Sequence, residues 1–111
     1  MTTLVRDRYI VYEVLTQPNC SDFSLTINEI RDSCWRTYTL LYGLNGTSGA
    51  GLYFEEYDDE KKKGLIRCTS KNLLQLKVVL SLITKMKDKE IIIHPIFITG
   101  VINKAKKVLK T

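Results

Sequence analysis

Four lysines stand at the end of the chain with no acidic residue among them: Lys104, Lys106, Lys107 and Lys110, all after Gly100. A helix beginning at Gly100 would point unpaired backbone N–H groups outward, and its dipole would favour an anion there. Lysines along its body would add the charge that a phosphate backbone attracts. The segment therefore predicts an RNA-binding helix, and the alternative is a solvated helix whose lysines only maintain solubility.

A second candidate is the stretch at residues 63–68, which begins Lys-Gly. In RNA-recognition modules the third strand starts this way and then carries aromatic side chains that stack on bases. The aromatics are missing here, and alternation places Arg67 on the face opposite Ile66 and Cys68. We expect Arg67 to contact phosphate or a partner, with strongly salt-dependent binding and little sequence preference. The alternative is that the C-terminal helix covers this face and Arg67 pairs with a carboxylate such as Glu13.

Two aromatic side chains are candidates for contact with a protein partner. Tyr9 and Tyr12 point to opposite faces of the predicted first strand, so one of them should accompany Arg67. Trp35 lies one position off the apolar stripe of the predicted first helix. We take Tyr9 and Trp35 as the candidate partner residues, and core filling is the competing interpretation of Trp35.

The chain offers little for catalysis or metal binding. Its one histidine, His94, sits in an apolar strand, where a structural role is expected rather than that of a base. Cys20, Cys34 and Cys68 are widely spaced, which argues against a zinc site or a disulfide framework and predicts buried thiols at Cys34 and Cys68. The acids of residues 55–60 read as a solvated strand end and turn. We expect no catalytic residue, no metal ligand and no cofactor held by this chain.

Composition places these residues in one small basic domain. The chain has 111 residues and a net charge of +5, with acids concentrated at 55–60, so the rest of the surface should attract polyanions. No apolar stretch approaches the roughly 20 residues of a membrane span, and no signal-peptide core is apparent. We expect a single soluble, intracellular domain over residues 1–111 without a membrane partner.

Periodicity predicts the elements that would position these residues. Strands are expected at 8–15, 52–57, 65–69 and 90–99, with a hairpin at 58–64, a charged connection at 85–89 and a sheet edge or bulge at Pro95. Thr26 and Glu29 form a capping box before a helix that should end at Gly43, followed by a loop over 44–51. Ser70 should cap the second helix. The predicted apolar stripes are Ile27, Ile30, Cys34, Tyr38 and Leu41 in one helix, and Leu73, Leu76, Leu80 and Ile83 in the other.

This order, β-α-β-β-α-β plus a terminal helix, predicts an α+β fold. It is the ferredoxin-like or RRM-like βαββαβ sandwich, in which two helices pack on one face of an antiparallel sheet, with an extra C-terminal helix. The same topology serves many unrelated functions, so the fold alone does not decide between RNA binding and other roles.

Three short motifs occur in the order of these elements: residues 8–10 with Glu13, residues 65–68 after the hairpin, and residues 100–102 before the lysines. Together they resemble the small protein subunit of ribonuclease P and ribonuclease MRP called "processing of precursors, subunit five", over nearly the whole chain. Members usually continue Gly-Thr-Ile-Arg/Lys where this chain has Val101 and Asn103, so a hydroxyl and a charge are lost. Lysines further along the helix would supply the charge instead.

The resemblance implies an RRM-like, non-catalytic subunit of an RNA-based endonuclease that removes the 5′ leader from precursor tRNA. The RNA and its magnesium carry out the hydrolysis, and the protein pairs with a TIM-barrel subunit and helps to fold the RNA. By position, the resemblance puts Arg8, Arg67 and Gly100 near RNA or partner. With the lysines, the candidate RNA-binding residues are Arg8, Arg67, Gly100, Lys104, Lys106, Lys107 and Lys110.

The resemblance also suggests a location. The start of the chain is closer to eukaryotic members than to archaeal ones, which favours the nucleus or nucleolus and membership of the ribosomal-RNA-processing sister enzyme; an archaeal member would be cytoplasmic. A second copy of the chain is kept as a candidate partner. The alternative function is a small regulatory or protein-interaction module of ferredoxin-like fold with no RNA role.

Overall fold

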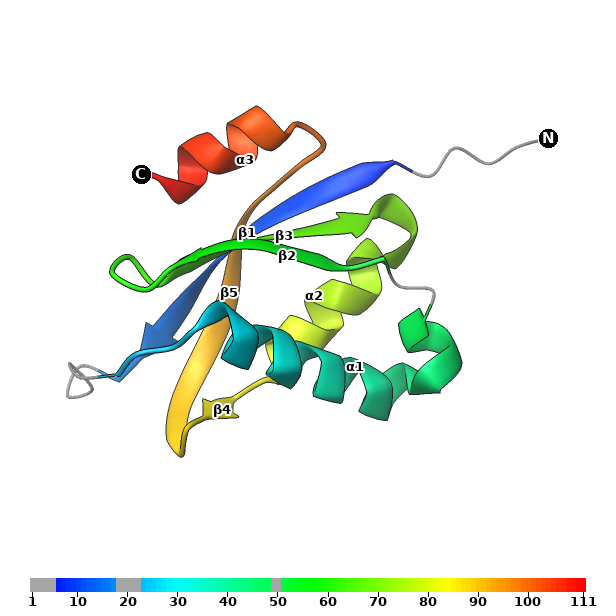
Figure 1. Ribbon diagram of the computed structural model, residues 1–111, viewed down its shortest axis with the longest axis horizontal. Helices are drawn as coiled ribbons and strands as arrows, with labels where there is room; N and C mark the ends of the chain where they lie inside the picture. The colour runs from blue at the N-terminus through cyan, green and yellow to red at the C-terminus, as the bar shows by residue number, and fades with distance from the viewer. Residues whose placement is uncertain (1–5, 18–22, 49–50) are drawn as a thin grey trace.

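The chain forms an antiparallel sheet covered by helices on both faces (Figure 1). The computed structural model describes residues 6–17, 23–48 and 51–111. The five described strands lie in the order β2-β3-β1-β5-β4, and the predicted α+β fold of the ferredoxin-like class is confirmed. The elements are β1 (Asp7–Thr16), α1 (Ile27–Ser48), β2 (Tyr53–Asp58), β3 (Lys63–Thr69), a 3-10 turn (Ser70–Asn72), α2 (Leu73–Leu82), β4 (Lys85–Met86), β5 (Lys89–Thr99) and α3 (Ile102–Leu109).

The main core lies between the sheet and the helices α1 and α2. Ile10 and Tyr12 of β1 and Ile66 and Cys68 of β3 face it, as alternation predicts. Cys34 of α1 is also fully buried there, and burial raises its pKa to about 12. The predicted buried thiols at positions 34 and 68 are confirmed, while Cys20 lies outside the described residues.

A smaller core lies on the other face, under α3. Tyr9, Val11 and Leu65 from the sheet pack against Ala105 and Leu109 of α3. Figure 1 shows α3 on the side of the sheet away from α1 and α2. The terminal helix is therefore a third layer that covers part of the sheet face on which RRM-like modules bind RNA.

The first helix begins as predicted and ends differently. Its capping box is formed, because the Glu29 N–H donates to Thr26 Oγ1 at 3.2 Å and the Thr26 N–H donates to Glu29 Oε1 at 3.0 Å. The predicted stripe is wrong at Leu41, which is 44% exposed, and Tyr42 packs on the core instead. Gly43 has φ 74°, so the helix kinks there rather than ending, and helical turns continue to Ser48 where a loop was expected.

Other boundaries differ for local reasons. Ser70 does not cap α2; it opens the 3-10 turn, and its N–H donates to the Arg6 carbonyl at 2.7 Å. The expected charged connection at 85–89 contains the short strand β4, because Lys87 and Asp88 both have positive φ and form a two-residue hairpin turn to β5. The predicted irregularity at Pro95 is confirmed, since the β1–β5 register shifts opposite it.

Candidate nucleic-acid interface

Two of the seven candidate RNA-binding residues, Arg8 and Gly100, meet at the end of the sheet where β1 begins, β5 ends and α3 starts. An open depression of about 670 Å³ lies there, and segments from β1 and from the β5–α3 connection line it. We call it the β1–α3 depression, and its lining residues are Arg6, Asp7, Arg8, Tyr9, Ile98, Thr99, Gly100 and Val101.

The start of α3 lies at this depression, and the Val101 N–H there donates to Thr99 Oγ1 at 3.1 Å. Val101 is its N-cap residue, no side chain caps the helix, and its first turn holds no acidic residue. The N–H of Ala105 is the first to bond back into the helix, at 3.2 Å from the Val101 carbonyl. Because the N–H groups before it have no partner within the helix, they and the helix dipole favour an anion at this end.

Arg8 and Gly100, two of the candidate RNA-binding residues, lie side by side here, but Gly100 does not open the helix. The helix begins two residues later, and a Cβ at Gly100 would lie 3.1 Å from Arg8 Nη1. The same Nη1 donates to the carbonyl of Asp7 at 2.9 Å. The absence of a side chain at Gly100 therefore leaves room for the Arg8 guanidinium beside the start of α3.

The lysines of α3 surround its buried stripe. Ala105 and Leu109 face the sheet, while all four lysines are exposed. Among the described residues, none of the four ammonium groups takes part in an ion pair. Uncompensated charge along an exposed helix is the arrangement that attracts a phosphate backbone. The four are Lys104, Lys106, Lys107 and Lys110.

Arg67 lies on the same face of the sheet as α3, opposite Tyr9 in the register, but it does not line the depression. Its guanidinium carbon is 4.2 Å from the ring centroid of Tyr53 on β2, and its Nε is 3.5 Å from Glu55 Oε1. The alternative prediction for Arg67, a covered face and an ion pair, is thus confirmed in part, because α3 covers some of this face and Arg67 pairs with a carboxylate. That carboxylate belongs to Glu55, whereas Glu13 lies in register with Lys63 and His94.

The Lys-Gly start of β3 has a packing reason. A Cβ at Gly64 would lie 2.2 Å from Tyr12 Cζ, so only glycine leaves room for this buried ring. The Tyr12 ring in turn stacks on Tyr57, with centroids 6.5 Å apart. Glycine at this position serves the core and is no sign of a base-binding strand.

The two candidate partner residues lie in different layers. Tyr9 is only 8% exposed beneath α3 and presents little surface to a partner. Trp35 is half-buried against the main core, with its ring 6.1 Å from that of Tyr38, as the core-filling interpretation expected. The larger exposed apolar surface is elsewhere, on α2, where Leu74, Val78 and Leu82 recur at helical spacing.

His94 is exposed on the sheet, where it lies opposite Glu13 in the register, so the expected structural role in the core is wrong. The acidic turn is more than a solvated one, because Asp59 accepts hydrogen bonds from the Leu25 N–H at 3.0 Å and from Lys62 at 2.7 Å. Burial opposes ionisation of Asp59, yet these donors hold its pKa well below its usual range.

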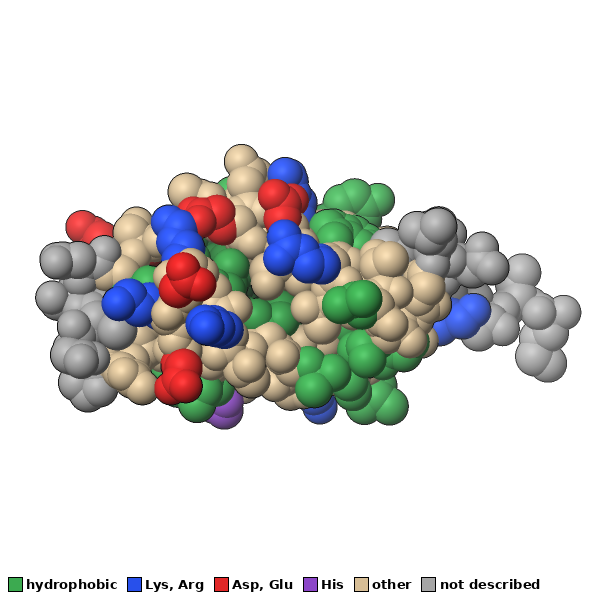
Figure 2. Space-filling view, turned by 90° about the horizontal axis from the view of Figure 1, so that it is seen from below, with side chains coloured by type: hydrophobic (Ala, Val, Ile, Leu, Met, Phe, Trp, Pro, Cys, Tyr) green, Lys and Arg blue, Asp and Glu red, His purple; other side chains and the backbone are tan. Residues whose placement is uncertain are grey.

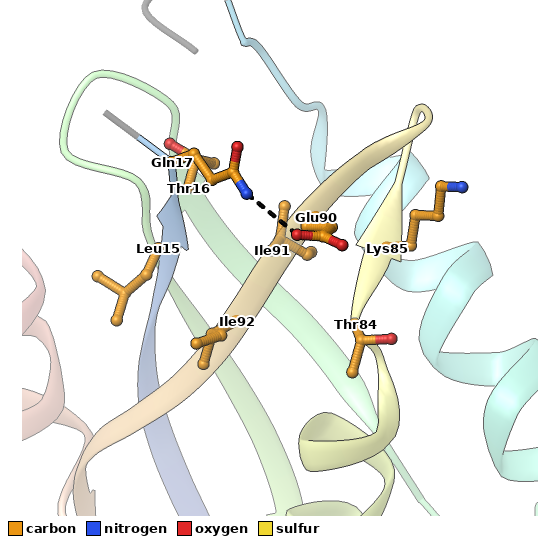
Figure 3. Close-up of a pocket in the computed structure, with 8 residues that line it drawn as sticks. All are labelled: Leu15, Thr16, Gln17, Thr84, Lys85, Glu90, Ile91 and Ile92. Carbon is orange, nitrogen blue, oxygen red and sulfur yellow. Dashed lines mark hydrogen bonds between the residues drawn. The ribbon is translucent and has the colours of Figure 1, made fainter. Parts of the chain in front are cut away.

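A second depression, of about 460 Å³, lies across β5 (Figure 3). Leu15 and Ile92 form an apolar side, and Gln17 Nε2 donates to Glu90 Oε2 at 3.0 Å. Lys85 extends away from the hollow (Figure 3). Because Gln17 and Glu90 bond to each other and Lys85 points outward, these three polar groups do not converge on a small molecule as a metabolite site requires.

The side of the molecule formed by α1 has a different character. Figure 2 shows lysines, arginines and acids interspersed over one half of that view and hydrophobic side chains gathered over the other half. The exposed apolar residues of α1 include Leu40, which is 81% exposed. Interleaved opposite charges give no single-sign field for a polyanion, in contrast to α3. No helix in the described part of the chain is long and apolar enough to cross a membrane.

These features define a small RRM-like α+β domain with a basic third helix and an anion-attracting end of the sheet. The chain belongs to the Rpp14/Pop5 family, whose sequence profile matches residues 8–110, and the resemblance seen in the sequence is confirmed. "Ribonuclease P protein component 2" of Pyrococcus abyssi is 30% identical over 102 residues, which cover 92% of this chain and 82% of that protein.

Further comparisons agree. The protein of the same name from Pyrococcus horikoshii is 26% identical, over 92% of this chain and 81% of its own length. A chain in the cryo-EM structure of yeast ribonuclease MRP superimposes with a TM-score of 0.73 at 15% identity, covering 99% of this chain and 90% of that chain. The structural likeness shows that the fold is shared.

Proposed function

We propose that this chain is a non-catalytic protein subunit of ribonuclease P or ribonuclease MRP that binds the enzyme's RNA through α3 and the β1–α3 depression. Membership of the Rpp14/Pop5 family over residues 8–110 is the observation that carries the assignment. The names of the relatives support the choice of enzyme. The unpaired lysines and the uncapped helix end support the choice of surface.

The role follows from what the surface provides. Backbone N–H groups, Arg8 and the α3 lysines are donors and positive charges, which hold phosphates and neutralise their repulsion. In the described residues, no group of three or more His, Cys, Asp or Glu side chains gathers as a metal site. We propose that the protein positions and stabilises the RNA, that removal of the 5′ leader from precursor tRNA is carried out by that RNA with its magnesium, and that a TIM-barrel subunit is the protein partner.

The assignment is tested by isolating a tagged copy of the chain from its native cells. The expected result is enrichment of one abundant structured RNA, together with magnesium-dependent cleavage of precursor tRNA at the 5′ leader. Enrichment of a structured RNA with cleavage of ribosomal-RNA precursor alone would place the chain in ribonuclease MRP. An eluate without enriched RNA would overturn the proposal in favour of a protein-interaction module.

The surface is tested with the double variant Lys104→Ala/Lys107→Ala. Removing two phosphate-facing charges should weaken RNA binding about equally for all sequences and lower the slope of log affinity against log salt by about 2. Salt titrations of RNA binding by the purified chain measure this slope. Arg36→Ala/Lys77→Ala is the matched control, since it removes the same charge from α1 and α2 on the side of the sheet away from α3. Equal slopes for both variants would remove α3 from the RNA interface.

A further inference from the structure

One row of side chains crosses the sheet at the end that carries the depression. In the strand register, Tyr53 of β2 lies opposite Arg67 of β3, which lies opposite Tyr9 of β1, which lies opposite Thr99 of β5. Paired residues share a face, and this face is the one that holds α3. Since neighbouring strands are about 4.8 Å apart, the row spans about 14 Å from Tyr53 on β2 to Thr99 at the end of β5.

The outer end of this row is open. The Tyr53 side chain is 55% exposed, and α3 packs over β1, β5 and β3 rather than over the start of β2. The Arg67 guanidinium carbon lies over the Tyr53 ring, 4.2 Å from the ring centroid. A tyrosine and an arginine already stacked and still accessible form a flat, polarisable, positively charged surface.

The guanidinium also has a donor without an acceptor. Among the described residues, Arg67 Nε has no hydrogen-bond partner, although it forms an ion pair with Glu55 Oε1 at 3.5 Å. The Tyr53 ring and this ion pair together hold the guanidinium in place. Glu55 stands at the rim of the same surface as a partly exposed acceptor.

A β-bulge creates the arrangement. Between Phe54 and Glu56 the β2–β3 register shifts by one residue, so Glu55 is the extra residue of β2. The shift sends Phe54 to the main core and Tyr53 to the face of Arg67. Without it, alternation would place Tyr53 on the core face and Phe54 beside Arg67.

We propose that Tyr53 and Arg67 form a stacking platform for one unpaired nucleobase of RNA. The proposal rests on the RNA-binding function proposed above and adds a base contact to its phosphate contacts. Aromatic rings and arginine planes are the surfaces on which single-stranded bases stack in RNA-binding modules. The Glu55 carboxylate would accept a hydrogen bond from an exocyclic amino group, so bases that carry one are preferred over uracil. In this platform the aromatic ring comes from Tyr53 of β2, because β3 lacks the aromatic side chains that RNA-recognition modules carry on this strand.

The variant that tests the platform is Tyr53→Ala in the full chain, with short oligoadenylate and oligouridylate RNA of equal length as probes. Losing one stacked base should weaken oligoadenylate binding by about 5- to 100-fold without changing the salt slope. Tyr53→Phe keeps the ring and should bind within about twofold of the wild type. Tyr53→Thr, which preserves strand propensity, serves if the alanine variant is poorly folded by circular dichroism.

The outcomes separate the platform from the function on which it rests. If Tyr53→Ala binds as the wild type does while Lys104→Ala/Lys107→Ala weakens binding, the platform is wrong and the RNA-binding surface stands. If neither variant changes binding, the proposed RNA-binding function fails as well. Glu55→Gln should reduce the preference for oligoadenylate over oligouridylate, and an unchanged ratio would remove Glu55 from base recognition.

Discussion

At the scale of single residues, long-range polar contacts are concentrated on a few side chains. Asp59 is the clearest case, because its carboxylate joins the β2–β3 hairpin to the segment that precedes α1. The Ser24 hydroxyl donates to Asp59 Oδ2 at 2.6 Å, and Lys62 Nζ reaches both Asp59 and the Phe23 carbonyl. A charged acceptor with several donors stabilises a fold more than an isolated surface ion pair does.

This contact predicts a pH-dependent effect of Asp59→Asn. The pKa of Asp59 is lower in the folded chain than in the unfolded one, so its contribution is present above the ordinary Asp pKa of about 3.9 and is lost as the pH falls further. At neutral pH the variant should lose about 1–2 kcal/mol of unfolding free energy, and the difference should shrink in acid. Urea unfolding at several pH values measures it. A pH-independent difference would mean that the carboxylate charge is not involved.

At the scale of elements, α1 and α3 differ in how the backbone N–H groups of their first turns are satisfied. α1 begins with a capping box in which Thr26 Oγ1 accepts from the Glu29 N–H, and the Glu29 carboxylate also pairs with Lys87 at 3.1 Å. α3 has no side-chain cap, and its first-turn donors remain available beside Arg8. The side-chain cap stabilises the start of α1, whereas the uncapped start of α3 favours an anion.

The cap of α1 gives a prediction at this scale. Thr26→Ala removes the hydroxyl that accepts from the Glu29 N–H and should cost about 1 kcal/mol of unfolding free energy. Thr26→Ser keeps the hydroxyl and is the control. Thermal or urea unfolding of both variants provides the measurement. Equal stability of Thr26→Ala and the wild type would show that the cap contributes nothing in solution.

At the scale of the whole molecule, the two sides of the sheet differ in what they can bind. The side of α3 carries exposed lysines and the uncapped start of the helix, while α2 on the opposite side exposes an apolar stripe of Leu74, Val78 and Leu82. Exposed apolar patches are common at protein–protein contacts. The fold thus places the proposed RNA-binding surface and this apolar stripe on opposite sides of the sheet.

This division predicts the effect of Leu74→Ser/Leu82→Ser. Capture of the proposed TIM-barrel subunit after ribonuclease treatment should fall at least tenfold, because each truncated anchor typically costs 1 kcal/mol or more, about 2–3 kcal/mol for the pair. RNA affinity of the isolated chain should not change. Ile92→Ser, an exposed apolar residue on the other face, is the control. Undiminished capture by the double variant would place the protein contact elsewhere.

The order of elements could be predicted from the sequence because it depends on near neighbours. Alternation in the first strand, the Thr26–Glu29 capping box and the spacing of Ile30, Cys34 and Tyr38 are all local patterns. The basic character of α3 and the face of Arg67 follow from residue type and alternation in the same way. The kink at Gly43 was missed, since a glycine that bends a helix has the same local signal as one that ends it.

The fold class, the family resemblance and the basic helix could be predicted without coordinates, because they rest on composition, periodicity and short motifs. Which side chains contact one another could be learned only from the folded chain. The bulge at Glu55 places Tyr53 on the face of Arg67, and the pairing of β1 with β5 places Arg8 beside Gly100. Such contacts depend on the register in which strands far apart in the sequence pair, because a shift of one residue moves every side chain of a strand to the opposite face of the sheet.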